Sequence, residues 1–355
     1  MPDVASPPVA GDVASDPARS ILARSRWIRL TGLAVCLAAL FAVALLSVWF
    51  GTRDIPLTEV WRLLWADPVS YNAVTIQAYR VPRTLLGIIV GIALGLAGAL
   101  MQALTRNPLA DPGLLGVNLG AATGVVAGVV FLGLGSVLEY VWLALAGAAL
   151  ASVVVYVLGM SGRSSAAPER LVLGGAAMGA VLYAVNTAIV MLFPLAFDDY
   201  RFWTVGSLGG RDLSVVKAVA PFIALGVVIA VLLARPLNAL TLGEQLGRAL
   251  GVHVGRTRVA TALAVMLLCG AATAAAGPIW FVGLAVPHIA RLIVGPDQRW
   301  VLTYSLLLAP ILLLGSDVLG RVLGAPSEIE VGIVTAFVGG PVFIALCRRR
   351  KLAAI

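Results

Sequence analysis

Long apolar stretches follow one another along the chain, separated by short segments rich in arginine, proline and glycine. The first, from Leu30 to Phe50, is about as long as the roughly 20 residues that a helix needs to cross hydrocarbon. The stretches far exceed the roughly ten-residue alternating strands of a membrane barrel. The pattern predicts an all-α, polytopic transmembrane helical bundle. About ten spans are expected, at residues 30–50, 81–104, 113–133, 138–160, 170–194, 215–235, 258–279, 281–295, 301–323 and 331–347.

Composition supports this fold class. Hydrophobic residues make up 60% of the chain, charged residues 12%, and the mean hydropathy is +1.00. A soluble domain carries about a quarter charged residues. Every backbone N–H and C=O in hydrocarbon must find a partner within the protein, as it does in a helix. The solvent around most of the chain is therefore expected to be lipid.

The positions of the basic residues predict the orientation. The net charge is +8, but the arginines stand at the ends of apolar stretches and form no stripe of the kind that binds nucleic acid. Most of the 25 Lys and Arg residues fall in both terminal segments and in alternate loops. Cytoplasmic segments carry such an excess, and an even number of spans places both ends on one side. Both termini are therefore expected to be cytoplasmic, in a multi-pass membrane protein.

Three regions are expected. Residues 1–27, rich in Pro, Ala, Asp and Ser at their start, predict a disordered cytoplasmic tail. Residues 28–347 form the transmembrane domain, and residues 348–355 a basic cytoplasmic tail. The first apolar stretch could be a signal peptide, with Cys36 near a faint lipoprotein-type cleavage site. It continues well past Cys36, which favours a retained signal anchor.

Two glycine spacings predict close helix packing, and the cysteines and histidines predict little chemistry. Gly87/Gly91/Gly95 and Gly175/Gly179 follow the small-xxx-small pattern, which lets helix backbones approach in lipid. The cysteines, Cys36, Cys269 and Cys347, lie far apart and show no disulfide or metal spacing. The histidines, His253 and His288, have no neighbouring ligand at metal-binding spacing. No metal site and no resident cofactor are expected in this chain.

Several segments carry a family resemblance. Residues 98–118 (GALMQALTRNPLADPGLLGVN) place two turn signals, Asn107-Pro108 and Asp111-Pro112-Gly113, between two spans. That string resembles a hallmark of the permease family of ATP-binding-cassette (ABC) importers for iron–siderophores, heme and vitamin B12. The resemblance extends over nearly the whole chain after residue 50. Its other carriers are Arg80-Val-Pro-Arg83-Thr-Leu and residues 242–251, 277–291, 317–321 and 330–343. Residues 105–109, 201–208 and 295–300 look most like ferric-catecholate (enterobactin-type) permeases.

The resemblance implies a transport subunit rather than an enzyme. It would translocate a ferric siderophore into the cytoplasm, fed by a periplasmic or lipid-anchored binding protein, and dimerise with a second copy or a homologous permease. A phosphate-binding loop needs glycines ending in Gly-Lys-Ser/Thr, and neither Lys217 nor Lys351 stands in that context. ATP and Mg are therefore expected on separate ATPase subunits.

Residues 236–258 predict a short cytoplasmic amphipathic helix. Leu242, Leu246 and Ala249/Leu250 recur at helical spacing, with Glu244, Gln245 and Arg248 off that face. The pattern alone fits either a helix lying on the lipid surface or a docking helix. The resemblance favours the second, an ATPase-coupling element. Its expected residues are Leu242, Gly243, Glu244, Gln245, Leu246, Gly247 and Arg248.

Arg80, Arg83 and Arg321 are expected on the opposite, periplasmic side. Such arginines can extend to lipid headgroups, and Arg321 can pair with Asp317 one turn earlier. In the family, arginines at these positions face acidic residues of the binding protein, a role that suits a guanidinium fork. Both interpretations stay open at this point.

Two other functions compete with that of a siderophore permease. An ion-coupled secondary transporter would need charged coupling groups inside the membrane, and the predicted spans hold almost none. A heme or cobalamin permease of the same family is the nearer alternative, because the partner protein chiefly selects the ligand.

Overall fold

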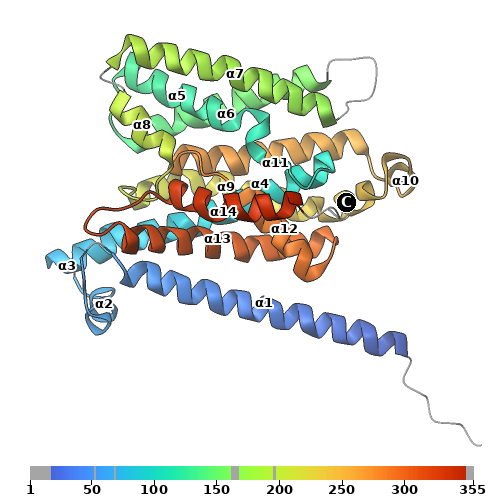
Figure 1. Cartoon of the computed structure of the whole chain (residues 1–355), viewed down its shortest axis with the longest axis horizontal. Coiled ribbons are helices and arrows are strands. Elements are labelled where there is room, and N and C mark those ends of the chain that lie inside the picture. The colour runs from blue at the N-terminus through green and yellow to red at the C-terminus, as the bar shows by residue number, and fades with distance from the viewer. Residues whose placement is uncertain (1–16, 52, 68, 161–167, 195–196, 349–355) are drawn as a thin grey trace, which may run out of the picture.

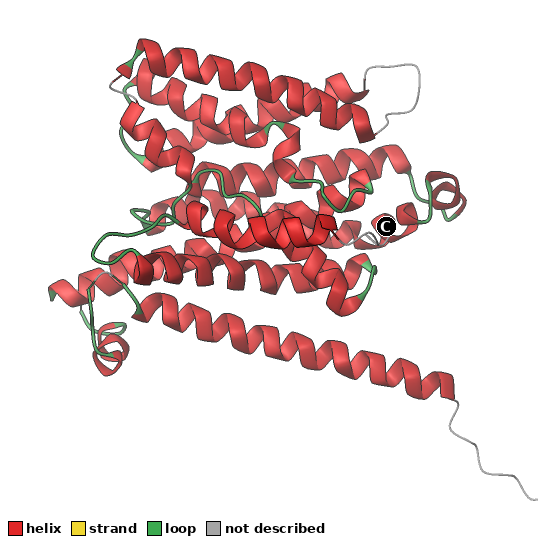
Figure 2. Ribbon diagram, viewed as in Figure 1, coloured by secondary structure: helices red, strands yellow, loops and turns green. Residues whose placement is uncertain are grey.

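The structure, a computed structural model, describes residues 17–51, 53–67, 69–160, 168–194 and 197–348. Within these residues every regular element is helical (Figures 1 and 2). The elements are α1 (Pro17–Trp49), α2 (Leu57–Leu63), α3 (Tyr71–Val74), the π-helix η1 (Thr75–Arg80), α4 (Val81–Thr105), the 3₁₀ turn η2 (Pro112–Leu115), α5 (Val117–Leu132), α6 (Val137–Met160), α7 (Pro168–Leu192), α8 (Phe197–Val205), α9 (Leu213–Thr241), α10 (Glu244–Ala249), α11 (Val254–Ala276), α12 (Val282–Val294), α13 (Gln298–Leu323) and α14 (Val331–Arg348).

The predicted transmembrane bundle is confirmed. Among the described residues, 7 helices are long and apolar enough to cross a membrane, and three shorter apolar helices, α5, α12 and α14, accompany them. Each predicted span corresponds to one of these helices. In Figure 1, α1 begins and α14 ends at the same end of the bundle, the end that also carries α10. That arrangement agrees with an even number of crossings.

The first helix begins earlier than expected. The tail predicted to be disordered over residues 1–27 is helical from Pro17 onward, while residues 1–16 lie outside the described part of the chain. Pro17 occupies the first helical position, where its fixed φ and missing N–H do no harm. Ala, Leu and Arg, all good helix formers, dominate the residues that follow. The helix of the first apolar stretch therefore extends N-terminally, without a break, through the arginine-rich residues before it.

The second crossing also begins earlier than residue 81. The chain is helical from Tyr71 to Thr105, and its turns over η1 are π-helical. Pro82 has no N–H to close a normal helical turn, so a wider turn before it is a physical way to keep the helix continuous. As a result, Arg80 and Arg83 lie within a continuous helical segment rather than in a loop.

Two further boundaries were wrong. The span expected over residues 113–133 is broken at Gly116, whose φ of 72° separates η2 from α5. The span expected to end at residue 235 continues as α9 through Pro236 to Thr241. The segment 236–258 therefore divides into the end of α9, the short helix α10 and the start of α11.

Helix α4 is at the centre of the bundle and packs against α13, α11, α12 and α9. Its glycines make this possible, as predicted from their spacing. A Cβ added at Gly91 would lie 2.6 Å from Cα of Pro310 on α13, and one at Gly98 would overlap the carbonyl of Gly283 on α12. By contrast, a Cβ at Gly179 would come no closer than 3.4 Å to a neighbouring side chain. Gly175 and Gly179 both line a pocket.

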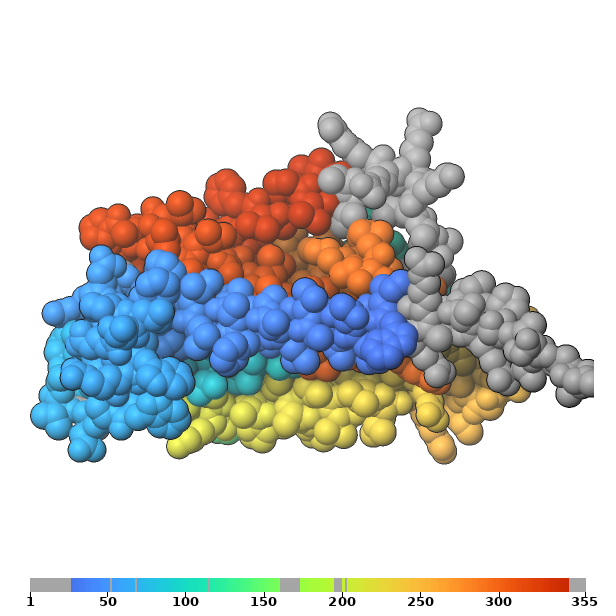
Figure 3. All heavy atoms as spheres, turned by 90° about the horizontal axis from the view of Figure 1, so that it is seen from below, coloured from blue at the N-terminus to red at the C-terminus, as the bar shows by residue number. Residues whose placement is uncertain are grey.

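Helix α1 lies at the edge of the bundle. It packs mainly on α13 and leaves most of its apolar side chains exposed. Figure 3 shows it running along one face of the molecule, with the block formed by α2 and α3 at one of its ends. An exposed apolar side of this kind is suited to contact with lipid.

Candidate functional site

Three buried arginines cluster at the end of the bundle that carries α2 and α3 (Figure 1). Arg80 ends η1, Arg83 lies in the first turn of α4, and Arg321 lies in the last turn of α13. The packing of α4 on α13 brings these residues together from distant parts of the sequence. The sequence predicted all three on one side of the membrane, either as docking residues or as anchors of helix ends, and the structure shows that they line one pocket.

Asp317 is the centre of this cluster. Its carboxylate accepts hydrogen bonds from Nε of Arg83 at 3.1 and 3.0 Å and from Nη2 at 2.8 Å. Oδ2 of the same carboxylate also pairs with Nη2 of Arg321 at 2.9 Å. Asp317 and both arginines are buried. Two guanidinium groups therefore neutralise one carboxylate inside the protein, a charge-assisted arrangement with fixed geometry.

The predicted pairing of Arg321 with Asp317 is thus confirmed, and Glu328 is a member of the cluster that the sequence did not reveal. Its carboxylate accepts from Nη1 of Arg83 at 2.6 Å. Glu328 lies in the connection between α13 and α14, which carries no motif of its own. No sequence signal marked it, because the contact spans 245 positions along the chain.

Arg80 and Arg321 also hold the end of α1. Arg80 donates to the carbonyl oxygens of Val48 and Trp49, and Arg321 donates to those of Ser47 at 2.8 Å and Phe50 at 2.5 Å. The last carbonyls of a helix have no partner within the helix and carry its negative dipole end. The two guanidinium groups satisfy these carbonyls, so the arginines are turned into the protein rather than toward lipid headgroups.

A pocket of about 430 Å³ opens beside the cluster. The three arginines and Glu328 line it together with Tyr71, Tyr79 and backbone at Gly209 and Gly210. The pocket is large enough for a side chain from another protein, and its lining holds three positive groups. Docking of a binding protein at Arg80, Arg83 and Arg321 stays a prediction.

The predicted coupling segment lies at the opposite end of the bundle (Figure 1). α10 is shorter than expected, with Leu242 just before it and Leu250 just after it. Leu242, Leu246 and Leu250 are all exposed, whereas Gly247 is buried against the end of α9. The described chain therefore presents an apolar row at this end with nothing packed on it.

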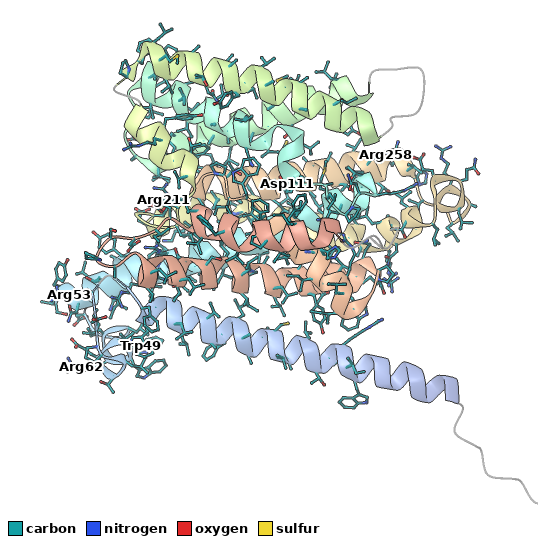
Figure 4. All side chains as sticks on the ribbon, in the orientation of Figure 1. Trp49, Arg53, Arg62, Asp111, Arg211 and Arg258 are labelled. Carbon is teal, nitrogen blue, oxygen red and sulfur yellow. The ribbon has the colours of Figure 1, made fainter. Side chains whose placement is uncertain are left out.

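Ion pairs fix α10 in place. Glu244 pairs with Arg258 at the start of α11 and, at 3.5 Å, with Arg248 one turn on. Arg258 is labelled at this end in Figure 4. The sequence marked Glu244 and Arg248 as lying off the apolar face, but it did not reveal the contact with Arg258. Gly243, with a φ of 112°, makes the sharp turn from α9 into α10.

A second pocket, of about 530 Å³, is mostly apolar. Trp280, Phe281 and Phe343 line it together with α7, and Asp111 stands at its edge. Burial raises the pKa of the Asp111 carboxyl, and the hydrogen bond from the Gly113 amide at 2.7 Å acts in the opposite direction. Among the described residues, no group of three or more His, Cys, Asp or Glu side chains is placed to hold a metal ion.

This architecture is that of a multi-pass membrane protein. Residues 39–349 match the model of the FecCD transport family, and the chain belongs to that family.

The chain is also similar to individual members of transport systems and to a solved structure. The chain is 44% identical to the ferric enterobactin transport system permease protein FepD of Escherichia coli (strain K12), covering 93% of this chain and 97% of that protein. It is 35% identical to the hemin transport system permease protein HmuU of Yersinia pestis, over 89% and 94% of the two chains. A solved structure described as an inward-facing conformation of a putative metal-chelate type ABC transporter superposes with a TM-score of 0.78, at 25% identity over 89% and 98%.

Proposed function

We propose that the chain is the membrane-spanning permease subunit of an ABC importer that moves a ferric siderophore, of catecholate type, into the cytoplasm. The observation that carries the proposal is the 44% identity to the ferric enterobactin permease over almost the full length of both chains. The hemin relative, at 35% identity, keeps heme as the second candidate cargo.

In this proposal the two ends of the bundle bind different partners. The exposed leucines of the α10 end would dock an ATPase subunit, which binds ATP and Mg and hydrolyses the nucleotide. The arginine-lined pocket at the other end would receive a periplasmic or lipid-anchored binding protein. The protein would then lie in the cell inner membrane, with both termini in the cytoplasm. A second permease copy, identical or homologous, would complete the pathway.

Docking at the arginine pocket would proceed by exchange of carboxylates. Glu328 occupies one edge of Arg83, while Asp317 occupies the other. Asp317 is deeply buried, and Glu328 is partly exposed at the pocket. An acidic side chain of a partner would compete with Glu328 and leave the buried pair intact.

Neutralisation of Asp317 separates this proposal from an ion-coupled transporter. A coupling carboxylate must release and rebind a proton or cation during the cycle. Asp317 lies between two guanidinium groups, each within 3.1 Å of its oxygens, and exchange with a proton would leave Arg321 without a carboxylate partner and Arg83 with Glu328 alone.

Reconstituted uptake tests the proposal. Vesicles with the permease and its ATPase should accumulate ferric enterobactin only when ATP and the loaded binding protein are present, and an ionophore should not abolish uptake. Hemin and ferric citrate serve as competitor cargoes. Uptake that survives without ATP and collapses with the ionophore would contradict the proposal, as would ATP turnover by the rigorously purified chain alone.

A further inference from the structure

The segment between α1 and α4 folds into a small unit with its own core. Ile55, Val60 and Leu63 pack on Ala73 and Ile76, and all five side chains are buried. This unit stands at the point where α1 ends and the second crossing begins, and Figure 1 shows it beside the end of α1.

α2 carries a second apolar row that this core does not use. Leu57, Trp61 and Trp65 recur at every fourth position, so the first two share one face of α2 and Trp65 follows just beyond its end. They are 54%, 64% and 80% exposed, and the two indole rings lie 6.4 Å apart in an edge-to-face arrangement. The inner row of the same helix, Val60 and Leu63, is buried. An exposed row of this size needs an apolar partner.

The residues around this row indicate what kind of partner covers it. The exposed side of α1, a helix long and apolar enough to cross a membrane, carries the apolar side chains of Leu37, Phe41 and Leu45. α2 is attached directly to the end of that helix. Tryptophan gathers where hydrocarbon meets headgroups, because its ring is apolar and its N–H can still find a partner.

Basic residues border the row. Arg62 on α2 and Arg53 before it are both exposed, as are Asp54 and Asp67, and Figure 4 shows the two arginines at this end with Trp49. Arg53 also lies over the ring of Tyr71 at 4.9 Å. Guanidinium groups beside an apolar row match a phospholipid leaflet, which presents phosphates above hydrocarbon.

We propose that Leu57, Trp61 and Trp65 seat in the headgroup–hydrocarbon boundary of the lipid leaflet at this end of the bundle, so that α2 is an interfacial membrane anchor. The inference depends on the membrane-spanning fold and not on the transported cargo or on the side of the membrane. Its partner is the phospholipid bilayer.

The anchor is joined rigidly to the arginine pocket. Nε2 of Gln77 donates to the carbonyl oxygens of Leu63 and Ala66, both at 2.7 Å, and thereby fixes the end of α2 to η1. Arg80 ends η1 and donates to the carbonyl of Arg53 at 2.5 Å. The tryptophans and the pocket are therefore held at a fixed position relative to each other.

Tryptophan quenching tests the anchor in the full chain. The protein is reconstituted in phosphatidylcholine–phosphatidylglycerol vesicles, with or without bromine on the acyl chains, and compared with the double variant Trp61→Phe, Trp65→Phe. The difference between the two emission spectra isolates these two of the 8 tryptophans. We expect that difference to lose most of its intensity in brominated vesicles and little of it when acrylamide is added to the water.

The matched control is Trp203→Phe. Trp203 is buried within the bundle, so its difference spectrum should respond weakly to both quenchers. If the double variant does not accumulate, Trp65→Phe alone gives the same comparison at smaller amplitude. Quenching of Trp61 and Trp65 by acrylamide but not by bromine would overturn the proposal, because the row would then face water. Quenching by neither would also overturn it, because another protein surface would then cover the row.

Discussion

Arg83 on α4 and Asp317 on α13 form a bidentate ion pair between residues 234 positions apart in the chain. The pair ties the central helix to its main packing partner. Since Asp317 also binds Arg321, and Arg321 holds the end of α1, one carboxylate connects three membrane-spanning helices at the same end of the bundle.

Removing that carboxylate should destabilise the protein strongly. Asp317→Asn keeps the size of the side chain but leaves the buried guanidinium of Arg321 without a counter-charge, and leaves Arg83 with Glu328 alone. Breaking a buried pair in this way typically costs about 3–5 kcal/mol. A thermal or SDS unfolding titration of the purified protein measures the free energy of unfolding.

Glu328→Gln is the control for that experiment. The Glu328 side chain is 31% exposed, against 1% for Asp317, and its pair with Arg83 is therefore largely screened by solvent. A loss of about 0–1 kcal/mol is expected. Equal losses in the two variants would show that Asp317 is not the centre of the cluster.

The same Glu328→Gln variant should speed association with the binding protein. The change removes a carboxylate that competes for Arg83 and raises the positive charge of the pocket, and charge of this kind acts mainly on the association rate. Surface plasmon resonance at several salt concentrations measures the rate and its dependence on ionic strength. Glu330→Gln, two residues further on and outside this pocket, should leave the rate unchanged. A rate unaltered by Glu328→Gln would argue against docking at Arg83.

Direct charge reversal of the arginines is a poorer test of docking. Arg83→Glu would place a third carboxylate against Asp317 and Glu328, and Arg80→Glu would face the carbonyls at the end of α1 with a negative charge. Both changes should impair folding before any partner arrives, so lost uptake would not identify a docking role.

Leu246→Asp should weaken ATPase association without preventing membrane insertion. Leu246 is exposed within the apolar row on α10, so a carboxylate there costs the fold little but removes apolar contact area from the proposed interface. Co-purification of the ATPase with the tagged permease measures the effect. Gln245→Asp adds the same charge off the row, and its yield of ATPase should match wild type. Full recovery of ATPase with Leu246→Asp would contradict the docking role.

Gly91→Ala should disrupt the contact between α4 and α13. The added methyl group would lie 2.6 Å from backbone of Pro310, which can only be relieved by moving the helices apart, at a cost of about 1–3 kcal/mol or more. Gly315→Ala is the matched change on the partner helix, since a Cβ there meets nothing within 4 Å. It should be neutral or stabilising by up to about 1 kcal/mol. The unfolding titration used for Asp317 compares the two.

The sequence predicted the crossings well because lipid imposes a simple rule on length and hydropathy. The predicted helix boundaries were wrong where proline and glycine, rather than length and hydropathy, decide the local structure. Pro82 and Pro236 look like helix ends in a sequence, yet neighbouring turns absorb both and the helices continue. Gly116 looked like one more small residue in an apolar stretch, but it adopts a positive φ and ends a turn.

The site was predicted in part. Arg83 and Arg321 were identified by their place in family motifs, and Asp317 by its spacing of one turn from Arg321. Glu328 was missed because its contact depends on how the connection after α13 folds back over α4. The burial of the arginines was also missed, since no sequence pattern shows that the carbonyls ending α1 lie within their reach.

The contrast between α1 and α4 implies an uneven tolerance of sequence change. α4 is enclosed on all sides by other helices, with glycines in contact with neighbouring backbone, so nearly every position has a fixed neighbour and a fixed volume. α1 leaves most of its apolar side chains exposed, and a lipid surface there would adapt to any apolar shape. Exchange of its middle for an unrelated apolar helix should preserve the fold if Ser47 and the carbonyls that follow it stay in register with Arg321. The first crossing is therefore where substitutions, tags or fusions should cost the least stability. In α4, by contrast, most substitutions should destabilise the fold.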